Sequence, residues 1–366
     1  MKRINLVQIG IGTVGGEVVG QVIANRERWR RELGLDVLIR AVIGTGGALP
    51  GEDIAGLSDA TLQAVVAGRQ AGLGLTEAAA GAALVPPAEA ISRLIPAGPT
   101  IVLDAAAGEE TAVLHGRALA SGARVVLSNK APLALPLANP LAAQMWDEAG
   151  PRGRLRYEAT CGAGLPVIST LRSLLDTGDE PIEIQGALSG TFGAIFSDLA
   201  NDVPFSAAVR NAKERGYTEP DPRDDLSGLD VARKALILAR TIGRQVDLTD
   251  IRVESLVPER LRQVSVAEFL DRVSELDEEM TARTARARDN GAALKYVATV
   301  PADGTIVVGM REVPAGGVLG ALQGPENVIA IRTKRYDAYP VTVVGPGAGA
   351  AVTAAGMLAD MLALAR

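Results

Sequence analysis

The sequence predicts an α/β protein in which a parallel-sheet domain is followed by an α+β domain with an open mixed sheet. Three observations lead to this fold class. A short apolar run, residues 4–9, ends at a glycine-rich turn that opens a helix. Apolar runs and helical stretches then alternate over about the first 150 residues, which favours parallel strands joined by crossover helices. After Pro151 the apolar runs shorten and alternate with polar residues, as antiparallel strands do.

The elements of the first domain, residues 1–150, follow from its apolar runs. Residues 4–9 and 35–43 predict buried strands on either side of a helix, which together form one βαβ unit. Residues 100–107 and 123–131 predict two further buried strands with a helix between them. The glycine turn, the helices and the strands together predict a doubly wound, Rossmann-type domain.

The second domain is expected over residues 151–345. A long charged helix is predicted at residues 266–290, and the small-residue helix at 346–366 is expected to return to the first domain. Short runs with a polar face predict antiparallel strands, at residues 154–160, 182–188, 294–300, 305–313, 327–335 and 339–345.

Composition narrows the functional classes. The chain has 366 residues, of which 48% are apolar, enough for two domains with sizeable cores. A net charge of -6 and an aromatic content of 3% argue against a nucleic-acid partner. No apolar run approaches the ~18 residues of a membrane span. Cys161 is the single cysteine, which excludes an intrachain disulfide and favours a cytoplasmic protein.

The glycine turn after the first strand has the G-x-G-x-x-G spacing of dinucleotide-binding folds. It follows a strand and opens a helix, which is the context this motif requires. Glycines allow backbone N–H groups to approach a pyrophosphate, and the positive end of the helix favours its charge. The alternative is a tight turn that binds nothing. The predicted cofactor-binding residues of this turn are Gly10, Ile11, Gly12, Thr13, Val14 and Gly15.

The choice between NAD and NADP stays open from the sequence. An acidic residue that binds the ribose is expected at the end of the second strand. Here the strand runs into Gly44–Gly47, and Asp36 lies at the opposite end. No lysine or arginine follows the strand to meet a 2′-phosphate, so we expect modest discrimination with NAD at least tolerated.

A cluster of acidic residues precedes an apolar helix that carries Lys234. Ser227 is expected to cap this helix, with Asp230 closing a capping box. Asp230 and Lys234 are four residues apart, so they lie on one face and can meet. They form either a solvated surface pair or a face that holds a small zwitterion and delivers a proton, with the preceding acids converging on its amino group. The acids are Glu219, Asp221, Asp224, Asp225 and Asp230.

Several stretches resemble the homoserine dehydrogenase family, in order and over nearly the whole chain. The acidic stretch GYTEPDPRDDLSGLDVARK, residues 216–234, resembles the signature of that family most specifically. The segment NKAPLA, residues 129–134, is similar to its cofactor-side lysine motif. Substrate-domain motifs of the family resemble residues 157–180 and 186–196, and its closing helix resembles residues 345–360.

The resemblance implies interconversion of L-aspartate 4-semialdehyde and L-homoserine by NAD or NADP, a step toward threonine, methionine and isoleucine. It implies Lys234 and Lys130 as catalytic residues, since an ammonium can stabilise the oxygen that gains charge when hydride reaches an aldehyde. It also implies a homodimer formed through the second domain. The implied substrate contacts are Glu219, Asp225, Asp230, Ser189, Gly190 and Thr191; further cofactor contacts are Ala106, Ala107, Lys130 and Gly347; a monovalent cation would bind Glu158, Cys161, Ala163 and Leu165.

The chain departs from the family at Ala105–Ala107, where hydroxyl side chains are common, so only backbone contacts to cofactor are expected there. It resembles the short, monofunctional form without an aspartokinase or regulatory domain, so no threonine inhibition is expected. His115 is the single histidine and is expected to be a packed residue. The alternatives are another NAD(P)-dependent amino-acid or semialdehyde dehydrogenase, or a non-catalytic dinucleotide-sensing protein.

Overall fold

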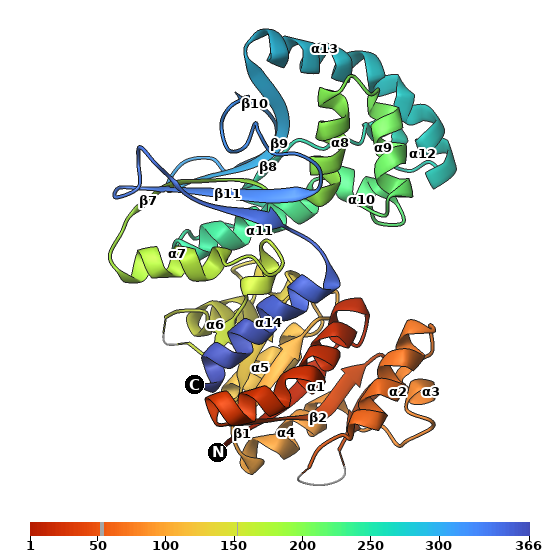
Figure 1. Ribbon diagram of the computed structural model, residues 1–366, viewed down its shortest axis with the longest axis vertical. Helices are drawn as coiled ribbons and strands as arrows, with labels where there is room; N and C mark the ends of the chain where they lie inside the picture. Colours follow the sequence, from red (N-terminus) through yellow and green to blue (C-terminus); the bar gives the residue numbers. More distant parts are fainter. Residues whose placement is uncertain (52–54, 152) are drawn as a thin grey trace. The chain divides into compact units, whose positions relative to one another are not determined.

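The computed structural model describes residues 1–51, 55–151 and 153–366. The chain forms two compact units, which we call the first unit (residues 1–164 and 349–366) and the second unit (residues 165–348) (Figure 1). The closing helix belongs to the first unit, as the sequence predicts. The boundary falls at 164/165, later than the expected position near Pro151, because a further strand and the loop after it belong to the first unit.

The first unit contains a six-stranded sheet of order β3-β2-β1-β4-β5-β6. All neighbours pair in parallel except β2 and β3, which form an antiparallel hairpin. The order reverses between β1 and β4, and ligands of doubly wound sheets bind outside the carboxyl ends of strands at such a switch point. The strands are β1 (Lys2–Ile9), β2 (Leu35–Gly44), β3 (Gly47–Pro50), β4 (Thr100–Asp104), β5 (Arg124–Leu127) and β6 (Leu155–Arg156).

Helices of the first unit pack an apolar core against this sheet. The helix after the glycine turn, α1 (Thr13–Leu33), lies beside α14 (Ala350–Ala365), and both contribute to one buried cluster with the strands (Figure 1). The remaining helices are α2 (Asp59–Gln70), α3 (Leu75–Ala78), α4 (Pro87–Leu94), α5 (Ala112–Ala120) and α6 (Pro140–Glu148), with short 3-10 helices η1 (Ile95–Ala97), η2 (Ala131–Ala134) and η3 (Glu158–Thr160).

The expectation of an antiparallel strand at residues 154–160 in the second domain is wrong. Leu155 and Arg156 form β6, which pairs in parallel with β5 at the edge of the first sheet. Leu155 and Tyr157 are buried while Arg156 is half-buried. The alternation therefore reflects an edge strand with one covered face, a pattern that the residues alone do not distinguish from an antiparallel strand.

The second unit contains the expected open mixed sheet, of order β12-β11-β7-β9-β10-β8. Its pairs are antiparallel except that of β8 with β10. The strands are β7 (Pro181–Ala187), β8 (Arg252–Val253), β9 (Ala292–Pro301), β10 (Val307–Pro314), β11 (Glu326–Thr333) and β12 (Val341–Pro346).

Helices α8, α11 and α13 of the second unit pack on β9. The helices of this unit are α7 (Val167–Asp176), α8 (Gly190–Ala200), α9 (Phe205–Glu214), α10 (Pro222–Leu226), α11 (Leu229–Thr241), α12 (Val266–Arg272) and α13 (Asp277–Asp289), with η4 (Leu248–Asp250), η5 (Glu259–Leu261) and η6 (Val273–Leu276).

The sequence predicts one helix over the charged residues 266–290, and this prediction is wrong. The stretch is divided into α12, η6 and α13. Asp277 begins α13, and its carboxylate accepts the backbone N–H and the hydroxyl of Ser206 on α9. This tertiary contact ties the first residue of α13 to α9. Within the described parts of the chain, none of the helices combines the length and apolar content that crossing a bilayer requires.

The start of α11 differs from the expected capping box. Ser227 ends α10, and Gly228 caps α11 in the left-handed region with a φ of 76°. A Cβ on Gly228 would lie 2.0 Å from the hydroxyl of Tyr296. Tyr296 stacks on Phe192 with ring centroids 3.8 Å apart and donates a hydrogen bond of 2.8 Å to the carbonyl of Glu254. Only glycine satisfies both the turn and this close approach, so the helix is anchored on β9 and α8.

Candidate active site

The glycine turn of the first unit is tightly folded between β1 and α1. Gly10 adopts a φ of 79°, and its N–H donates to the carbonyl of Ile43 at 2.8 Å. A Cβ on Gly15 would lie 1.9 Å from the carbonyl oxygen of Gly10, and a Cβ on Gly10 would lie 2.6 Å from the backbone nitrogen of Ala106. Both glycines are therefore required by close backbone approach. The turn is thereby held against the loop that follows β4.

The outer side of the same turn is open. Apart from the neighbours of Gly12 in the chain, no heavy atom of the described residues lies within 4 Å of the position that its Cβ would take. Gly12 is the N-cap residue of α1, and no side chain in the described ranges caps that helix or places an acid in its first turn. Backbone N–H groups and the positive helix end thus face space that a pyrophosphate would fill. The residues present fit a dinucleotide.

The end of β2 lacks both features that distinguish the two cofactors. Gly44 and Gly47 face each other in the turn that joins β2 to β3. Asp36, at the start of β2, is 2.6 Å from Arg30 and 3.3 Å from Arg3, so it stabilises the packing of α1 on the sheet. Among the residues that the structure describes, no acid or base is therefore added at the position that would contact the ribose.

The loops after β4 and β5 bring the other cofactor-side residues to the same edge of the sheet. Ala106 is half-buried and Ala107 is exposed. Lys130, half-buried, precedes η2 directly after Asn129. Parallel strands present their carboxyl ends along one edge, so these loops and the glycine turn lie at the switch point of the sheet.

Lys234 of the second unit is buried on α11, with 8% of its surface exposed. Its ammonium lies 2.8 Å from the Asp230 carboxylate and donates to the carbonyl of Leu188 at 2.6 Å. Leu188 directly precedes Ser189, which caps α8 by accepting the N–H of Phe192. The predicted pair of Asp230 and Lys234 is confirmed, and the buried ammonium excludes the simple solvated surface pair.

Asp225 orders the acidic loop. One of its oxygens accepts the Thr191 hydroxyl at 2.9 Å, and the other accepts the backbone N–H of Glu219 at 2.8 Å. Burial raises the pKa of the Asp225 carboxyl, although these two hydrogen bonds oppose the shift and the charges of Glu219 and Asp230 add to it. The structure thus brings Asp225, Thr191, Glu219 and Asp230 together. Glu219 itself is exposed, and the contacts of this group with a substrate stay a prediction.

Of the two remaining acids of the motif, Asp221 is structural and Asp224 is exposed. Asp221 caps α10 and forms a two-oxygen pair with Arg223, at 2.7 Å for the shortest contact. Arg223 also donates to carbonyls of the loop after η5 and lies over the ring of Phe269. Asp224 lies in the first turn of α10. This structural role of Arg223 was not predicted from the sequence, in which its separation of two residues from Asp221 was the only indication.

Gly347, predicted to contact the cofactor, follows β12 in the second unit. A Cβ at this position would lie 1.8 Å from the side-chain amide of Asn327 on β11. Asn327 is fully buried, so its amide cannot move aside easily. The need for glycine at this position is therefore explained by packing within the second unit. A Cβ on Gly190 would lie 3.2 Å from the carbonyl oxygen of Pro325, which is tight but less severe.

The predicted cation loop begins in the first unit. Glu158 and Cys161 are buried, and Ala163 adopts a φ of 55°, which is uncommon for a residue with a side chain. Leu165 begins the second unit. In the described ranges no three His, Cys, Asp or Glu side chains form a group that could hold a metal ion. Asp360 of α14 accepts the backbone N–H of Glu158 at 2.8 Å, a contact that the sequence did not indicate.

Asp360 is expected to make the stability of the folded chain fall as the pH rises. Burial raises the pKa of its carboxyl from 3.8 to about 7. Between these values the folded chain keeps a proton that the unfolded chain releases, so stability declines with rising pH until the folded carboxyl also ionises. Asp360→Asn can still accept the N–H of Glu158. It should match the parent near pH 4 and exceed it at pH 8, by a free energy on the order of 4 kcal/mol. Thermal melts of both proteins across this range measure the difference, and a gain that is the same at every pH would contradict the assignment.

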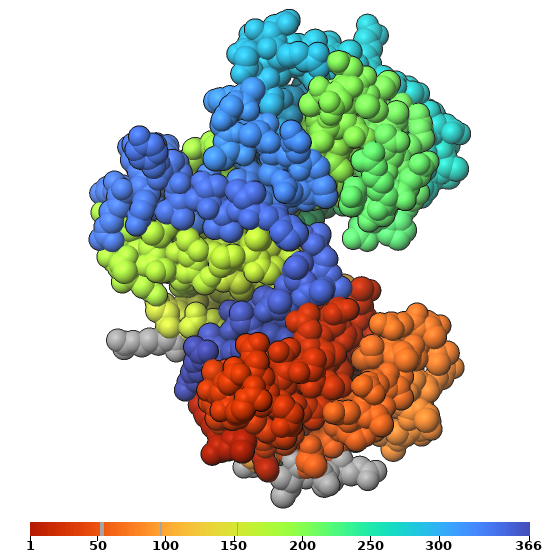
Figure 2. All heavy atoms as spheres, in the orientation of Figure 1, coloured from red at the N-terminus to blue at the C-terminus, as the bar shows by residue number. Residues whose placement is uncertain are grey.

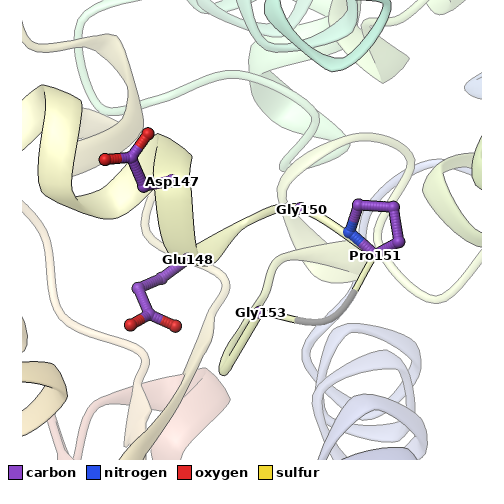
Figure 3. A pocket seen from close by; sticks show the side chains of 5 residues that line it. All are labelled: Asp147, Glu148, Gly150, Pro151 and Gly153. Carbon is purple, nitrogen blue, oxygen red and sulfur yellow. The ribbon is translucent and has the colours of Figure 1, made fainter.

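A surface pocket lies away from these residues, where α6 turns toward β6 (Figure 3). Its lining side chains include Asp147 and Glu148 (Figure 3). The Glu148 carboxylate binds Arg154, which lowers the pKa of Glu148. The pocket contains none of the predicted site residues, and its main charged group already stabilises the turn.

Comparisons with known sequences agree with the motifs. A family model for homoserine dehydrogenase matches residues 166–362. The chain is 40% identical over 275 residues to the homoserine dehydrogenase of Saccharomyces cerevisiae, and the aligned region covers 73% of this chain and 76% of that protein. It is 42% identical over 268 residues to the bifunctional aspartokinase/homoserine dehydrogenase of Daucus carota, and the aligned region covers 73% of this chain but 29% of that protein. The chain thus spans less than a third of this bifunctional relative.

Solved structures share the fold over nearly the whole chain. A Candida auris protein of unknown function superposes with a TM-score of 0.86 at 32% identity, over 100% of this chain and 99% of that one. A hyperthermophilic archaeal homoserine dehydrogenase in complex with NADPH superposes with a TM-score of 0.73 over 98% of this chain and 97% of that one. The second similarity, at 23% identity, shows a common fold.

Proposed function

This chain belongs to the homoserine dehydrogenase family, and from this premise we propose that it interconverts L-homoserine and L-aspartate 4-semialdehyde with a nicotinamide cofactor. The observation that carries the proposal is the buried Lys234 ammonium, placed between the Asp230 carboxylate and the Leu188 carbonyl at the end of the acidic loop. A buried ammonium beside carboxylates suits a small substrate that carries both an ammonium group and an oxygen that changes charge. This reaction would place the chain in threonine, methionine and isoleucine biosynthesis.

The first unit would hold the dinucleotide. The turn from Gly10 to Gly15 offers backbone N–H groups and open space beside Gly12 for the pyrophosphate. Ala106, Ala107 and Lys130 would meet the nicotinamide end, and Gly347 is proposed as a further cofactor contact. When bound, the cofactor takes up the hydride that leaves the carbinol carbon of homoserine. Since this chain has alanines at positions 105–107, their contacts with the cofactor would be through backbone atoms.

The second unit would hold the amino acid. The carboxylates of Glu219, Asp225 and Asp230 would hold the amino-acid part of the substrate, and Asp225 would also keep the loop in place through Thr191. The backbone from Ser189 through Gly190 to Thr191 would line the substrate. In the direction of reduction, the Lys234 ammonium would donate a proton to the aldehyde oxygen as hydride arrives, which leaves a neutral amine. In the oxidation of homoserine that neutral amine would accept the hydroxyl proton as hydride leaves, and Lys130 would assist.

A monovalent cation is proposed at the loop that contains Glu158. Glu158 is buried, and its charge contributes to the raised pKa of Asp360, so the loop concentrates negative charge that a cation would offset. The Glu158 carboxylate and the carbonyls of Cys161, Ala163 and Leu165 would provide oxygen ligands, which hard cations prefer.

A homodimer through the second unit is also proposed. β12 is an edge strand of its sheet, and exposed edge strands favour pairing with another chain. The hairpin that joins β11 to β12 projects from the second unit in Figure 2. It carries the exposed side chains of Tyr336 and Tyr339, and Val344 on β12 is 52% exposed. A cytoplasmic location is proposed because the cofactor and the substrate are metabolites of the cell interior.

Reduction of NAD+ and of NADP+ in the presence of L-homoserine tests the proposal. Appearance of the reduced cofactor, dependent on homoserine, is the expected result. Oxidation of another amino acid or hydroxy acid in its place would identify a different dehydrogenase. Binding of cofactor without turnover of any such substrate would identify a dinucleotide sensor.

The two cofactors should be used with modest discrimination, and NAD should be at least tolerated. No acid or base of the described chain lies at the end of β2 where the ribose 2′ position would be recognised. The ratio of kcat/KM for NAD+ and NADP+ at saturating homoserine measures this preference. A preference for NADP+ above about a hundredfold, equivalent to roughly 2.7 kcal/mol, would reveal a phosphate-binding residue elsewhere.

A further inference from the structure

Asp104, the last residue of β4, is a buried acid for which no role is assigned so far. Its side chain has no exposed surface. It lies at the switch point of the first sheet, directly before the loop of residues 105–108. A carboxylate in such a position is costly unless several donors satisfy it.

Four groups surround the Asp104 carboxylate. One oxygen accepts the backbone N–H of Ala106 at 2.8 Å. The other accepts the Thr111 hydroxyl at 2.8 Å and the Asn129 amide at 3.2 Å, and it lies 3.0 Å from Nε2 of His115. Burial alone would raise the pKa of Asp104, but His115 and the two shorter hydrogen bonds hold it below its usual value. The side chain is therefore an ionised acceptor.

These bonds join the loop after β4 to the loop after β5. The Asn129 amide also donates to the carbonyl of Gly108 at 2.8 Å, and its oxygen accepts the N–H of Ala131 at 3.1 Å. Lys130 lies between these two residues. The same loop after β4 is the one that Gly10 approaches closely. One carboxylate thus connects the segment before Lys130 with the segment that contacts the glycine turn.

We propose that Asp104 is a positioning residue of the dinucleotide site, which sets the backbone of residues 105–108 and the segment around Lys130 for the nicotinamide end of the cofactor. The inference rests on the proposed function. Its physical reason is the alanine run at 105–107. A loop with alanine side chains can form hydrogen bonds to a cofactor only through backbone atoms, and the backbone direction depends on what fixes the loop. The hydrogen bond from the Ala106 N–H to the Asp104 carboxylate fixes the backbone direction of this loop.

The decisive variant is Asp104→Asn. It keeps the size of the side chain but replaces one acceptor oxygen by an NH2 group that faces other donors. Dissociation constants for NADH and NADPH are measured by cofactor fluorescence without substrate, followed by steady-state kinetics and thermal melts. We expect cofactor binding at least about tenfold weaker and a lower turnover number, while the KM for homoserine at saturating cofactor changes less than about threefold.

Asp179→Asn is the matched control. Asp179 is a buried acid of the second unit, and its carboxylate likewise accepts a threonine hydroxyl, from Thr333 at 2.7 Å, and the backbone N–H groups of Glu180 and Arg335, at 2.9 and 3.2 Å. The same replacement at Asp179 should lower the melting temperature and leave cofactor binding within about threefold of the parent. If Asp104→Asn is destabilised to the same extent and also binds cofactor like the parent, Asp104 serves stability alone and the proposal is overturned.

Thr111 provides a second test if Asp104→Asn does not fold. Thr111→Val removes a hydroxyl that bonds both Asp104 and Asn129, whereas Thr111→Ser retains it. The proposal requires weaker cofactor binding, by at least about threefold, in the valine variant and parent-like binding in the serine variant. Equal binding in both overturns it. A parent protein that binds neither cofactor overturns the proposed function and this inference together, whereas a parent that binds and variants that bind equally overturn only this inference.

Discussion

Lys234→Met is expected to lower the turnover of homoserine by at least about a hundredfold, within the range of about 10²–10⁴ that general acid–base catalysis provides. Methionine keeps an unbranched stem but has neither the charge nor the proton. The change removes the group that lies 2.8 Å from Asp230 and 2.6 Å from the carbonyl of Leu188. Turnover with saturating homoserine and cofactor measures the effect.

A loss of turnover in Lys234→Met could also come from destabilisation of the fold, because removal of a buried ammonium can leave its hydrogen-bond partners unsatisfied. The side chain of Asp230 is 46% exposed, so water can solvate its carboxylate, but the Leu188 carbonyl loses its donor. Melting temperatures are therefore measured alongside. Lys334→Met is the matched control, since Lys334 is 64% exposed and pairs with Glu180 on the surface of the same unit. A folded Lys234→Met protein whose turnover is within about threefold of the parent would remove Lys234 from the mechanism.

A companion variant separates binding from proton transfer. Glu219→Gln keeps the backbone N–H that donates to Asp225 but removes an exposed negative charge from the loop. It should raise the KM for homoserine more than it lowers turnover, since the lost interaction is with the substrate ammonium in both ground and transition states. The opposite pattern in the two variants would exchange the roles assigned to Lys234 and Glu219.

Gly12→Ala is expected to abolish most cofactor binding without unfolding the protein, with at least about a hundredfold rise in the KM for NAD(P)+, since affinity changes tenfold per 1.4 kcal/mol. Gly12 has a φ of -82°, which alanine adopts freely, and the site of the added methyl group is open. The methyl group would occupy the space in which the pyrophosphate approaches the backbone.

Two alanine substitutions in α1 bracket this experiment. Gly15→Ala should destabilise the fold itself, because its Cβ would lie 1.9 Å from the carbonyl oxygen of Gly10. Gly20→Ala is on the exposed face of the same helix and should be neutral or stabilising by up to about 1 kcal/mol. Melts and cofactor titrations of the three variants distinguish a folding defect from a binding defect. Parent-like cofactor affinity in Gly12→Ala would place the pyrophosphate away from this turn.

The sequence alone determined the features that depend on local spacing. The turn from Gly10 to Gly15 follows from a strand, three glycines and a helix within one short segment, and close backbone approach confirms why glycine is needed. The meeting of Asp230 and Lys234 follows from their separation of four residues on a helix. The strands β1, β2, β4 and β5 of the first unit follow in the same way from apolar runs, whereas β3 and β6 do not.

Only the tertiary structure decided the features that depend on residues far apart in the chain. Gly228 caps α11 in place of the expected box because Tyr296 occupies the space beside it. Leu155 and Arg156 join the first sheet because β5 offers an unpaired edge. Asp225 is directed to Thr191, and Asp104 to Asn129, by the packing of separate loops. Local spacing sets which face of a helix or strand a side chain occupies, whereas the partner on that face is set by long-range packing, and the roles of the buried acids depend on that partner.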